Sequence, residues 1–460
     1  MRELVEKLKE IVGPEYVSDA AEERWLYARD PGTMPASPPD MVVLPGTTEE
    51  VRQVVGLANE HGTPVVPMGA GLVLSGLMRA LKGGIVLDMK RMNRVLEVNE
   101  AGRYAVVEAG CSEGVLKAHL KRHCPRLKHS LPDAPPAATI AGNVLIHGSG
   151  HLSVAAGYHS DMLNGLEVVL PNGEVARTGS CSVSPYWFGR APLPDLSGLF
   201  VGWAGTTGVV TKLAIKLYPD YAHNDMGIFV CEDEDIMPDV IGRIAGTMVV
   251  EDLTPWMGPK PEWAAGFLHA NVSWGAHSGE ELRFKRNLVR ASVKEYIDRK
   301  IAGFIPLPPP QKKRFFEIPA SDLARFADVR KGGGFEYVGA IMPVHLFPDA
   351  YRAGMAIAEK HRVAWSMGAR VVGVAHSMMF FYAYAFNRAD EDDVQRAQHA
   401  LEETNEAALE LGGIPWKAEE PAQKGILARM DPGAAALMDR VRKAIDPNGI
   451  MNPGNWERGS

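Results

Sequence analysis

Hydrophobic and polar positions in the first 110 residues alternate between the periods of helices and strands. Apolar side chains recur at helical spacing in residues 2–12, and a capping box of Thr47 and Glu50 precedes a second amphipathic segment. Short apolar runs that predict strands lie at residues 41–44, 65–66, 85–89 and 103–107. The pattern therefore predicts alternating helices and strands, with residues 103–107 paired beside residues 85–89.

Residues 134–156 break this periodicity, because small residues dominate there and charge is almost absent. Backbone with so few side chains lets a large planar ligand approach closely and offers N–H groups to phosphates, although a buried packing segment explains the same composition. A hairpin pattern follows. An apolar run at residues 166–170 meets Pro171-Asn172-Gly173 before a second strand, and Asn-Gly tolerates the positive φ of a tight turn.

Two glycine turns are further candidates for ligand binding. The strand at residues 65–66 runs into Pro67-Met68-Gly69-Ala70-Gly71, where a phosphate group would rest on backbone N–H groups. A plain tight turn accounts for this sequence equally well. A second turn, Gly205-Thr206-Thr207-Gly208, lies between a helix-like piece and a strand within residues 199–217.

The composition changes near Pro219. From there to about residue 411, apolar strands alternate with long charged helices. The predicted strands lie at residues 227–231, 263–271, 335–342 and 378–386, and the predicted helices at residues 278–300, 349–361 and 390–411. The chain ends with a predicted helix at residues 433–445 and the turn cluster DPNGIMNPG, which must pack at a specific place.

Composition narrows the functional classes. The 460 residues are enough for about two domains, and 46% apolar with 23% charged residues is ordinary for a soluble enzyme. A net charge of −7 argues against nucleic acid as a partner. Four cysteines without CxxC spacing suggest neither a zinc nor an iron–sulfur site, and they fit a reducing, cytoplasmic compartment. The amphipathic N-terminal helix is predicted to be neither a signal peptide nor a membrane span.

Several motifs together resemble one known family. The run KRMNRVLEVNEAGRYAVVEAG at residues 90–110, the run HGSGHLSVAAGYHSDMLNGLEVVLPNGEVARTG at residues 147–179 and the closing DPNGIMNPG are similar to sequences of the vanillyl-alcohol oxidase and p-cresol methylhydroxylase family. The resemblance is strong over residues 40–218 and looser over residues 336–456. It implies FAD as cofactor and an α+β fold, with a two-part FAD-binding domain of the p-cresol methylhydroxylase type and an α+β cap domain built on an antiparallel sheet. The implied parts are residues 1–218 for the FAD-binding domain, 219–425 for the cap and 426–460 for the return to the FAD-binding domain.

The resemblance also implies which residues hold FAD. The implied FAD-binding residues are Pro67, Gly69, Ala70, Gly71, Ser75 and Gly76 around the pyrophosphate, Pro132, Asp133, Ile140, Gly142 and Asn143 around the isoalloxazine and the rest of the dinucleotide, Gly205, Thr206, Gly208 and Val210 on the adenosine side, and Asn452 at the flavin. His345 lies near where some members attach FAD covalently, although a lone histidine before a helix is usually only a cap residue.

The chain departs from the family pattern at the substrate site. Phenol-oxidising members bind the phenolate with a tyrosine in the glycine turn and a Tyr-Arg pair near the end of the cap, where this chain has Leu74, Trp416 and Lys417. A positive charge is kept, but the tyrosine hydroxyls are lost. Members that oxidise glycolate or D-lactate carry a histidine-rich metal motif that residues 373–377 do not match, so we expect no metal ion.

Five residues are candidates for the chemistry. Asp133 is the first choice for a carboxylate near the flavin ring, with a turn cap as the alternative, and His159 matches a family histidine beside the flavin or serves a structural role. Lys417 would neutralise an anionic substrate oxygen and raise the ionised fraction of a bound phenol, unless it is a solvated lysine at a helix end. Trp416 and Tyr384 would form aromatic walls, although packing in the cap core explains Tyr384 more simply.

These inferences predict an FAD-dependent oxidoreductase that transfers a hydride from a small aromatic alcohol or alkylphenol-like substrate to flavin N5. Two alternatives stay open. One is a 2-hydroxy-acid dehydrogenase that passes electrons to a protein acceptor, and the other is a flavin-carrying subunit of a larger electron-transfer complex. The flavin is reoxidised by oxygen, a cytochrome or an electron-transfer flavoprotein, and we expect a homo-oligomer.

Overall fold

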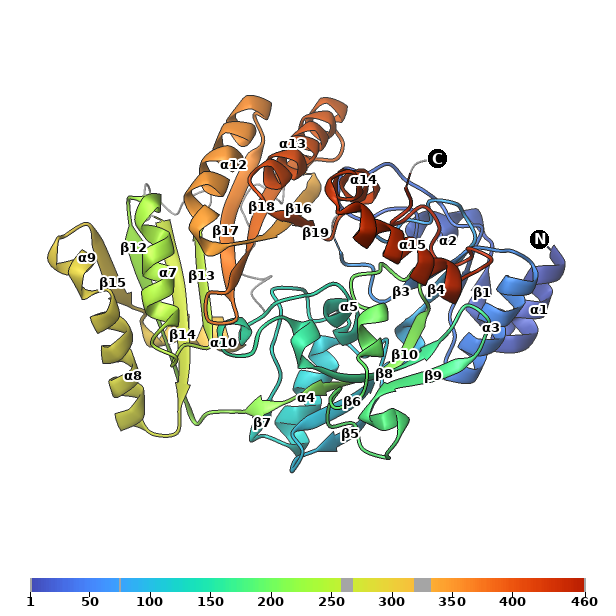
Figure 1. The fold of residues 1–460 in the computed structure, drawn as a ribbon, viewed down its shortest axis with the longest axis horizontal. Helices are drawn as coiled ribbons and strands as arrows, with labels where there is room; N and C mark the ends of the chain where they lie inside the picture. Colours follow the sequence, from blue (N-terminus) through green and yellow to red (C-terminus); the bar gives the residue numbers. More distant parts are fainter. Residues whose placement is uncertain (1, 74–75, 258–267, 318–331, 459–460) are drawn as a thin grey trace.

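In the computed structural model, which describes residues 2–73, 76–257, 268–317 and 332–458, the chain forms two α+β domains (Figure 1). We call residues 2–219 the N-terminal domain, residues 223–416 the cap domain and residues 417–458 the C-terminal segment. The α+β class expected from the sequence is confirmed.

Four short strands make the first sheet of the N-terminal domain, in the order β1 (Val17–Ser18), β2 (Met41–Val43), β4 (Ile85–Asp88) and β3 (Val65–Met68). Strands β2 and β3 lie parallel to β4. Helices α1 (Arg2–Val12) and α3 (Thr48–Glu60) pack against each other. The predicted capping box is confirmed, because Thr47 accepts a hydrogen bond from Glu50 N (3.1 Å) and the Glu50 carboxylate accepts one from Gly46 N (2.7 Å).

Five antiparallel strands make the second sheet, in the order β5 (Val95–Asn99), β6 (Tyr104–Glu108), β10 (Val209–Lys216), β8 (Leu163–Val169) and β9 (Val175–Gly179). The predicted hairpin joins β8 to β9 through Asn172 and Gly173, whose φ is +83°. The expected pairing of β6 beside β4 is wrong, because β6 pairs with β5 and β10 in this second sheet. One hydrophobic core joins both sheets to α1, α3, α4 (Glu113–His123) and α5 (Ile140–Leu145).

The cap domain is built on one antiparallel sheet of eight strands. Their order is β15 (Ala302–Pro306), β12 (His223–Cys231), β14 (Leu268–Ala276), β13 (Asp252–Met257), β17 (Ala364–Val372), β18 (Ser377–Asn387), β16 (Gly333–Met342) and β19 (Ile414–Trp416). One face is covered by α7 (Met237–Ala245), α8 (Gly279–Ser292), α12 (Phe347–His361) and α13 (Glu391–Glu410) (Figure 1). Within the described ranges, none of the helices combines the length and the hydrophobicity that crossing a membrane requires.

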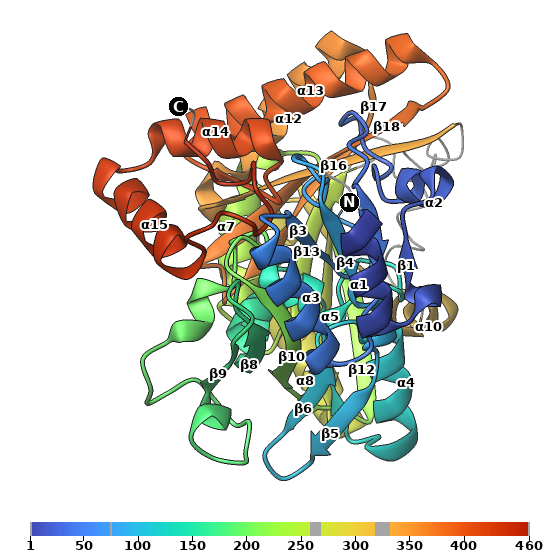
Figure 2. The ribbon, with the colours of Figure 1, turned by 90° about the vertical axis from the view of Figure 1, so that its right-hand side faces the viewer.

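Strand β18 shows how the two faces of the cap sheet differ. Tyr384 points toward α13, where its hydroxyl bonds to Thr404 Oγ1 (2.7 Å). Met379 points the other way, toward the N-terminal domain, and its sulfur accepts a hydrogen bond from Ser149 Oγ (3.4 Å). Helix α6 (Ser153–Ala156) of the N-terminal domain also contacts β13 and β17. The second face of the cap sheet therefore meets the N-terminal domain. Figure 2 looks from the side of the N-terminal domain, with α1 and α3 in front and the cap behind.

The segment before β2 reaches across to the cap domain. Pro31 O accepts a hydrogen bond from Phe335 N, and Thr33 donates its backbone N–H (2.8 Å) and its hydroxyl (2.9 Å) to Glu336 Oε2. Glu336 is fully buried on β16, and its Oε1 has no hydrogen-bond partner among the described residues. Burial raises the pKa of Glu336 to about 8, so this carboxyl group is mainly protonated at neutral pH.

The C-terminal segment returns to the N-terminal domain. Helix α14 (Glu420–Arg429) packs on α13, and α15 (Pro432–Ile445) follows it. Val65 N then donates a hydrogen bond to Ile450 O (2.8 Å), and Asn452 N donates one to Val65 O (2.9 Å). Residues 450–452 therefore lie alongside β3, so the C-terminal segment packs against a strand formed early in the sequence.

Candidate active site

Loops of the N-terminal domain meet at the end of β3. Gly69 lies so close to Thr139 that a Cβ atom at Gly69 would be 2.4 Å from Thr139 Oγ1. Gly71 turns the chain with a φ of +67°, which favours glycine. Gly205 packs closely against Pro67, since a Cβ atom at Gly205 would be 3.2 Å from the Pro67 ring. The glycines therefore hold these loops within contact distance of one another.

Asn452, from the C-terminal segment, completes this group. Its Nδ2 donates a hydrogen bond to Ala204 O (2.6 Å), whereas its Oδ1 is buried without a hydrogen-bond partner in the described part of the chain. Leaving a buried acceptor unpaired is costly, so this atom fits a bound group that brings a donor. FAD carries such donors on its ring nitrogen and hydroxyl groups. We call the glycine loops and Asn452 the cofactor cradle, and its residues fit FAD.

Other residues implied to hold FAD shape the loops instead of presenting side chains to a ligand. Ala70 is exposed beside the cradle. Asn143 donates to Glu113 Oε1 (2.7 Å), and the N–H of Gly142 donates to Thr139 Oγ1 (3.2 Å). Gly208 packs against β8, where a Cβ atom would meet Val169 O at 2.8 Å. Four more of the implied FAD-binding residues have buried side chains within the domain, namely Pro132, Ile140, Thr206 and Val210.

Gly76 does not have the phosphate-binding role that the resemblance implied. Its N–H donates a hydrogen bond to Asp30 Oδ2 (2.7 Å), so this donor is already used. The Asp30 carboxylate would also repel a phosphate group at this point. Ser75, implied to bind the pyrophosphate, and Leu74 lie outside the described residues.

A group of aromatic and charged side chains lies where the cap sheet meets the glycine turn. Lys417 follows β19 with a φ of +58°, and its Nζ lies 4.2 Å from the centre of the Trp416 ring and 5.0 Å from that of Tyr337. The ammonium group also donates to Val73 O (3.4 Å). Tyr337 stacks on Phe381 with ring centres 5.6 Å apart and meets Trp416 edge-on at 6.3 Å. We call Tyr337, Phe381 and Trp416 the aromatic cluster.

The charge of Lys417 responds to mild changes in pH. Burial lowers the pKa of Lys417 to about 8, although the nearby carboxylate of Asp30 opposes this effect. Lys417 is therefore mainly charged at pH 7 and loses its charge in mild base. While charged, it interacts favourably with the faces of the Trp416 and Tyr337 rings.

An ion-pair network borders the aromatic cluster. Arg370, on β17, pairs with Asp133 at 2.7 Å and with Asp252 at 3.0 Å, and His151 Nε2 lies 3.5 Å from Asp133 Oδ1. Burial alone would raise the pKa of Asp133, but Arg370 and His151 outweigh it and hold this pKa well below its usual value. The Asp133 side chain is 40% exposed, whereas that of Arg370 is 7% exposed. Asp133 is therefore an ionised group at the open side of the network, suited to steady a positive charge and poorly suited to accept a proton.

His159 lies inside the N-terminal domain, beside a different pair. Its N–H donates to Gly148 O (2.7 Å), and its Nε2 is buried without a partner within the described ranges. Glu113 and His129, bonded to each other at 2.7 Å, line a small cavity together with His159. Burial lowers the pKa of His159 to about 4, so its ring is neutral at physiological pH. The structure gives His159 no contact with the aromatic cluster among the described residues.

Two predicted site residues lie on the helix-covered side of the cap sheet. Tyr384 is fully buried in the cap core with its hydroxyl bonded to Thr404, so the aromatic-wall prediction is wrong and core packing is correct. His345 is exposed in the turn Val344–Leu346, which contacts α7 and precedes α12. Because α7 and α12 cover the face that points away from the N-terminal domain, the structure does not bring His345 to the cofactor cradle, contrary to the covalent-attachment prediction.

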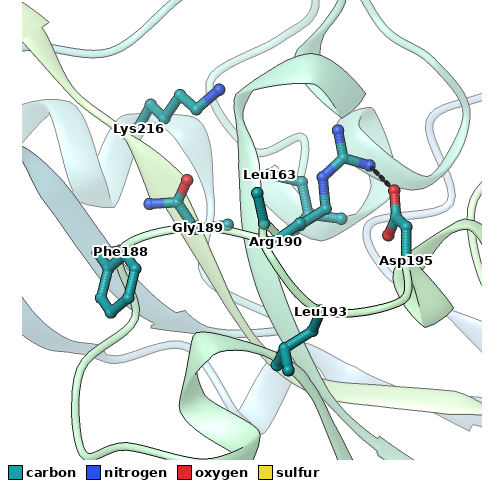
Figure 3. A pocket seen from close by; sticks show the side chains of 9 residues that line it. Leu163, Phe188, Gly189, Arg190, Leu193, Asp195 and Lys216 are labelled. Carbon is teal, nitrogen blue, oxygen red and sulfur yellow. Dashed lines mark hydrogen bonds and ion pairs between the residues drawn. The ribbon is translucent and has the colours of Figure 1, made fainter.

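A separate surface cavity of about 570 Å³ lies on the N-terminal domain (Figure 3). The proline-rich loop at residues 188–195 forms one side, with Arg190 paired to Asp195 (2.9 Å), and Lys216 at the end of β10 lies across from it. None of its lining residues belongs to the cofactor cradle or the aromatic cluster. This cavity therefore does not coincide with the candidate active site.

The sequence pattern did not single out Tyr337, Phe381 or Arg370. All three lie in cap strands, where alternate residues face opposite sides of the sheet. A signal for Arg370 was present, because an arginine within an otherwise apolar strand must pair with a carboxylate when it is buried.

A glycine-loop cradle that is completed by the end of the chain, under a cap of antiparallel strands, defines a two-domain flavin-dependent oxidoreductase. Residues 39–179 match the family model described as FAD binding domain, and residues 311–456 match the model described as FAD linked oxidases, C-terminal domain. The chain belongs to the FAD-linked oxidases of the vanillyl-alcohol oxidase and p-cresol methylhydroxylase type. The predicted family, FAD cofactor and enzyme class are therefore confirmed.

Similarity to individual proteins extends over nearly the whole chain. The chain is 30% identical to 1'-carboxy-chondrochloren decarboxylase of Chondromyces crocatus, over 90% of this chain and 90% of the relative. It is 25% identical to glycolate oxidase subunit GlcD of Bacillus subtilis (strain 168), over 98% of this chain and 96% of the relative. The crystal structure of p-cresol methylhydroxylase with substrate bound shares the fold, with a TM-score of 0.86 at 20% identity over 99% of this chain and 96% of the other. The names of these proteins point to different substrates, so the substrate must be argued from the site.

Proposed function

We propose that this protein oxidises a small aromatic alcohol or alkylphenol by hydride transfer to N5 of FAD. The observation that carries the proposal is the aromatic cluster with Lys417 above it. Tyr337, Phe381 and Trp416 offer ring faces and edges against which a substrate ring packs well. The Lys417 ammonium supplies a positive charge within 5.0 Å of two of these rings. Such a site suits a substrate that is flat, largely apolar and anionic at one end.

The residues of the chain prepare the substrate for a reaction whose hydride-accepting chemistry FAD supplies when bound. Lys417 would neutralise a phenolate or carboxylate oxygen, because an unpaired anion taken out of water is costly. Asp133, fixed by Arg370, would stabilise positive charge that develops on the carbon losing the hydride. A fixed ion pair can do this without rearranging during the reaction.

A 2-hydroxy-acid dehydrogenase is the second candidate. Similarity to a glycolate oxidase subunit over nearly the full length supports it, and Lys417 would also bind a small carboxylate. The metal motif of such enzymes is missing from the sequence, and the aromatic cluster has no evident purpose for glycolate or D-lactate. We therefore place this function second.

We also propose a protein electron acceptor, a cytochrome or an electron-transfer flavoprotein, and a cytoplasmic location. The relative that is named as a subunit supports an acceptor or partner protein. The four cysteines are all buried and unpaired, which supports a reducing compartment. If the partner is essential, the protein is the flavin-carrying subunit of a larger complex.

Anaerobic reduction of the bound flavin tests these proposals. The purified holoprotein is mixed with 4-hydroxybenzyl alcohol, p-cresol, glycolate or D-lactate, and the flavin absorbance is followed. We expect the two aromatic compounds to bleach the flavin and the two hydroxy acids to leave it oxidised. Reduction by the hydroxy acids alone would establish the second candidate. If none of the four compounds reduces the flavin, the result would favour the hypothesis that this protein is the flavin-carrying subunit of a larger complex.

A further inference from the structure

At the positions where phenol-oxidising relatives hold a phenolate with tyrosines, this chain has Leu74 and Trp416, which carry no hydroxyl group. At the end of the cap this chain has Trp416, and its indole N–H already donates to Ile146 O. Lys417 gives one positive charge at the site, but an oxygen anion accepts more than one hydrogen bond. A phenolate held beside Lys417 therefore needs a further donor.

Tyr337 brings a hydroxyl to the same place from a different strand. Gly339, two residues further along β16, pairs with Trp416 on β19, and residues two apart in a strand face the same side. The Tyr337 ring is held by stacking on Phe381 at an angle of 17° between the ring planes. Within the described ranges, the hydroxyl of Tyr337 makes no hydrogen bond to the protein. The ring is therefore fixed while its polar atom stays available.

The charged groups of the site act on both the hydroxyl and the ring of Tyr337. Burial raises the pKa of Tyr337, the Asp133 carboxylate raises it further, and Arg370 opposes them. Both members of the ion pair therefore act on the hydroxyl, while Lys417 lies above the ring of the same residue. A tyrosine in this setting stays neutral and keeps its proton to donate.

We propose that Tyr337 is the residue that donates a hydrogen bond to the phenol oxygen of the substrate, together with Lys417, and so takes over the role of the missing tyrosines. This inference rests on the proposed function, because it requires a phenolic substrate in the aromatic cluster. It assigns the choice of substrate to a residue of β16 that lies outside the motifs described in the sequence analysis. Substrates with a free phenol are favoured over their methyl ethers, because the ether oxygen is a poorer acceptor and cannot be anionic.

Ligand binding to Tyr337→Phe tests this inference, since phenylalanine keeps the stacked ring and removes only the hydroxyl. The probes are 4-hydroxybenzaldehyde and 4-methoxybenzaldehyde, which resemble oxidation products and are followed by their effect on the flavin spectrum. The wild-type holoprotein should prefer the hydroxy compound, and Tyr337→Phe should weaken its binding roughly 10- to 100-fold, the range for losing a hydrogen bond to a charged group. Binding of the methoxy compound should hardly change.

Tyr382→Phe is the matched control. Tyr382 lies on β18, and its hydroxyl bonds to Ala350 O (3.2 Å) on the helix-covered face of the same sheet. Its loss should leave both probes unaffected. A Tyr337→Phe protein that keeps the full preference for the hydroxy compound, or that loses its FAD, would overturn the inference while leaving the proposed function standing. If neither probe perturbs the wild-type flavin, the proposed function itself is wrong, and the role of Tyr337 with it.

Discussion

Replacing Lys417 with methionine removes the positive charge at the aromatic cluster and keeps a flexible side chain of similar length. The Nζ atom lies 4.2 Å from the Trp416 ring and 5.0 Å from the Tyr337 ring, so a substrate ring in this cluster brings its polar end within reach of the charge. Two unit charges about 4 Å apart attract by about 4 kcal/mol at an effective dielectric constant near 20. Deleting one partner of a desolvated charge pair costs roughly 2–5 kcal/mol.

We expect Lys417→Met to lose about 2–4 kcal/mol of transition-state binding for an anionic substrate, which lowers its kcat/KM roughly 30- to 900-fold. The assay compares 4-(hydroxymethyl)benzoate with neutral 4-methylbenzyl alcohol on the wild type, on Lys417→Met and on the control Lys424→Met. Lys424 forms an exposed ion pair with Glu420 on α14, away from the cluster, so its loss should change neither substrate. Flavin content should be equal in all three proteins.

The pH profile provides an independent check on the same residue. With a pKa of about 8, Lys417 is charged below pH 8 and loses its charge above it. The kcat/KM of the wild type for the anionic substrate should therefore fall as the pH rises through 8, and that of Lys417→Met should not. Equal losses for the anionic and neutral substrates, or an unchanged pH profile in the variant, would refute the role given to Lys417.

Three further predictions concern the cradle, the cap and the absence of a metal. Asn452→Ala should lower FAD retention on gel filtration at least about tenfold, because it removes the only side-chain link described between the C-terminal segment and Ala204. Replacing the exposed Asn448 with alanine should leave FAD binding as in the wild type. Equal FAD retention by both variants would contradict the role given to Asn452 in the cofactor cradle. The raised pKa of Glu336 means that the folded state holds an extra proton between pH 4.5 and 8, so stability falls as the pH rises through this window. Glu336→Gln should remove this loss of stability. At about 1.4 kcal/mol per pH unit, the free energy of urea unfolding of the variant should rise by roughly 2–3 kcal/mol relative to that of the wild type between pH 5 and 7. Identical pH dependence of unfolding in the two proteins would refute the raised pKa of Glu336. Treatment with a chelator should leave turnover unchanged, since the histidine motif of the hydroxy-acid enzymes is missing, and activity restored by added zinc or manganese would contradict this.

The sequence predicted the local structure correctly where that structure depends on neighbouring residues. The Thr47 cap and the Asn172-Gly173 turn are as expected, because each depends on a few adjacent residues. The pairing of β6 was mispredicted, since partners in a sheet are chosen by the whole core. The sequence also did not predict which face of the cap sheet each side chain occupies. A shift of one residue reverses the face of a strand, and this separates Tyr384 in the core from Phe381 at the site.

The cofactor cradle was predicted from the family resemblance, and its details needed the fold. Gly76 belongs to the same glycine-rich run as Gly71, but only the structure shows that its N–H is used by Asp30. The ion pair of Arg370 and Asp133 joins residues 237 positions apart, and no spacing in the sequence reveals it. Contacts between distant segments are set by packing, which a single sequence does not display.

The hydrogen bonds of β3 with Ile450 and Asn452 have a consequence for the order of events during biosynthesis. A ribosome releases the amino end first, so α1, the two sheets and the whole cap emerge before the residues that close the cradle exist outside the ribosome. Until residues 450–452 have emerged, the edge of β3 that they cover stays unpaired. An unpaired strand edge is the kind of surface that promotes aggregation, so chains that stop before residue 450 should aggregate more readily than full-length chains.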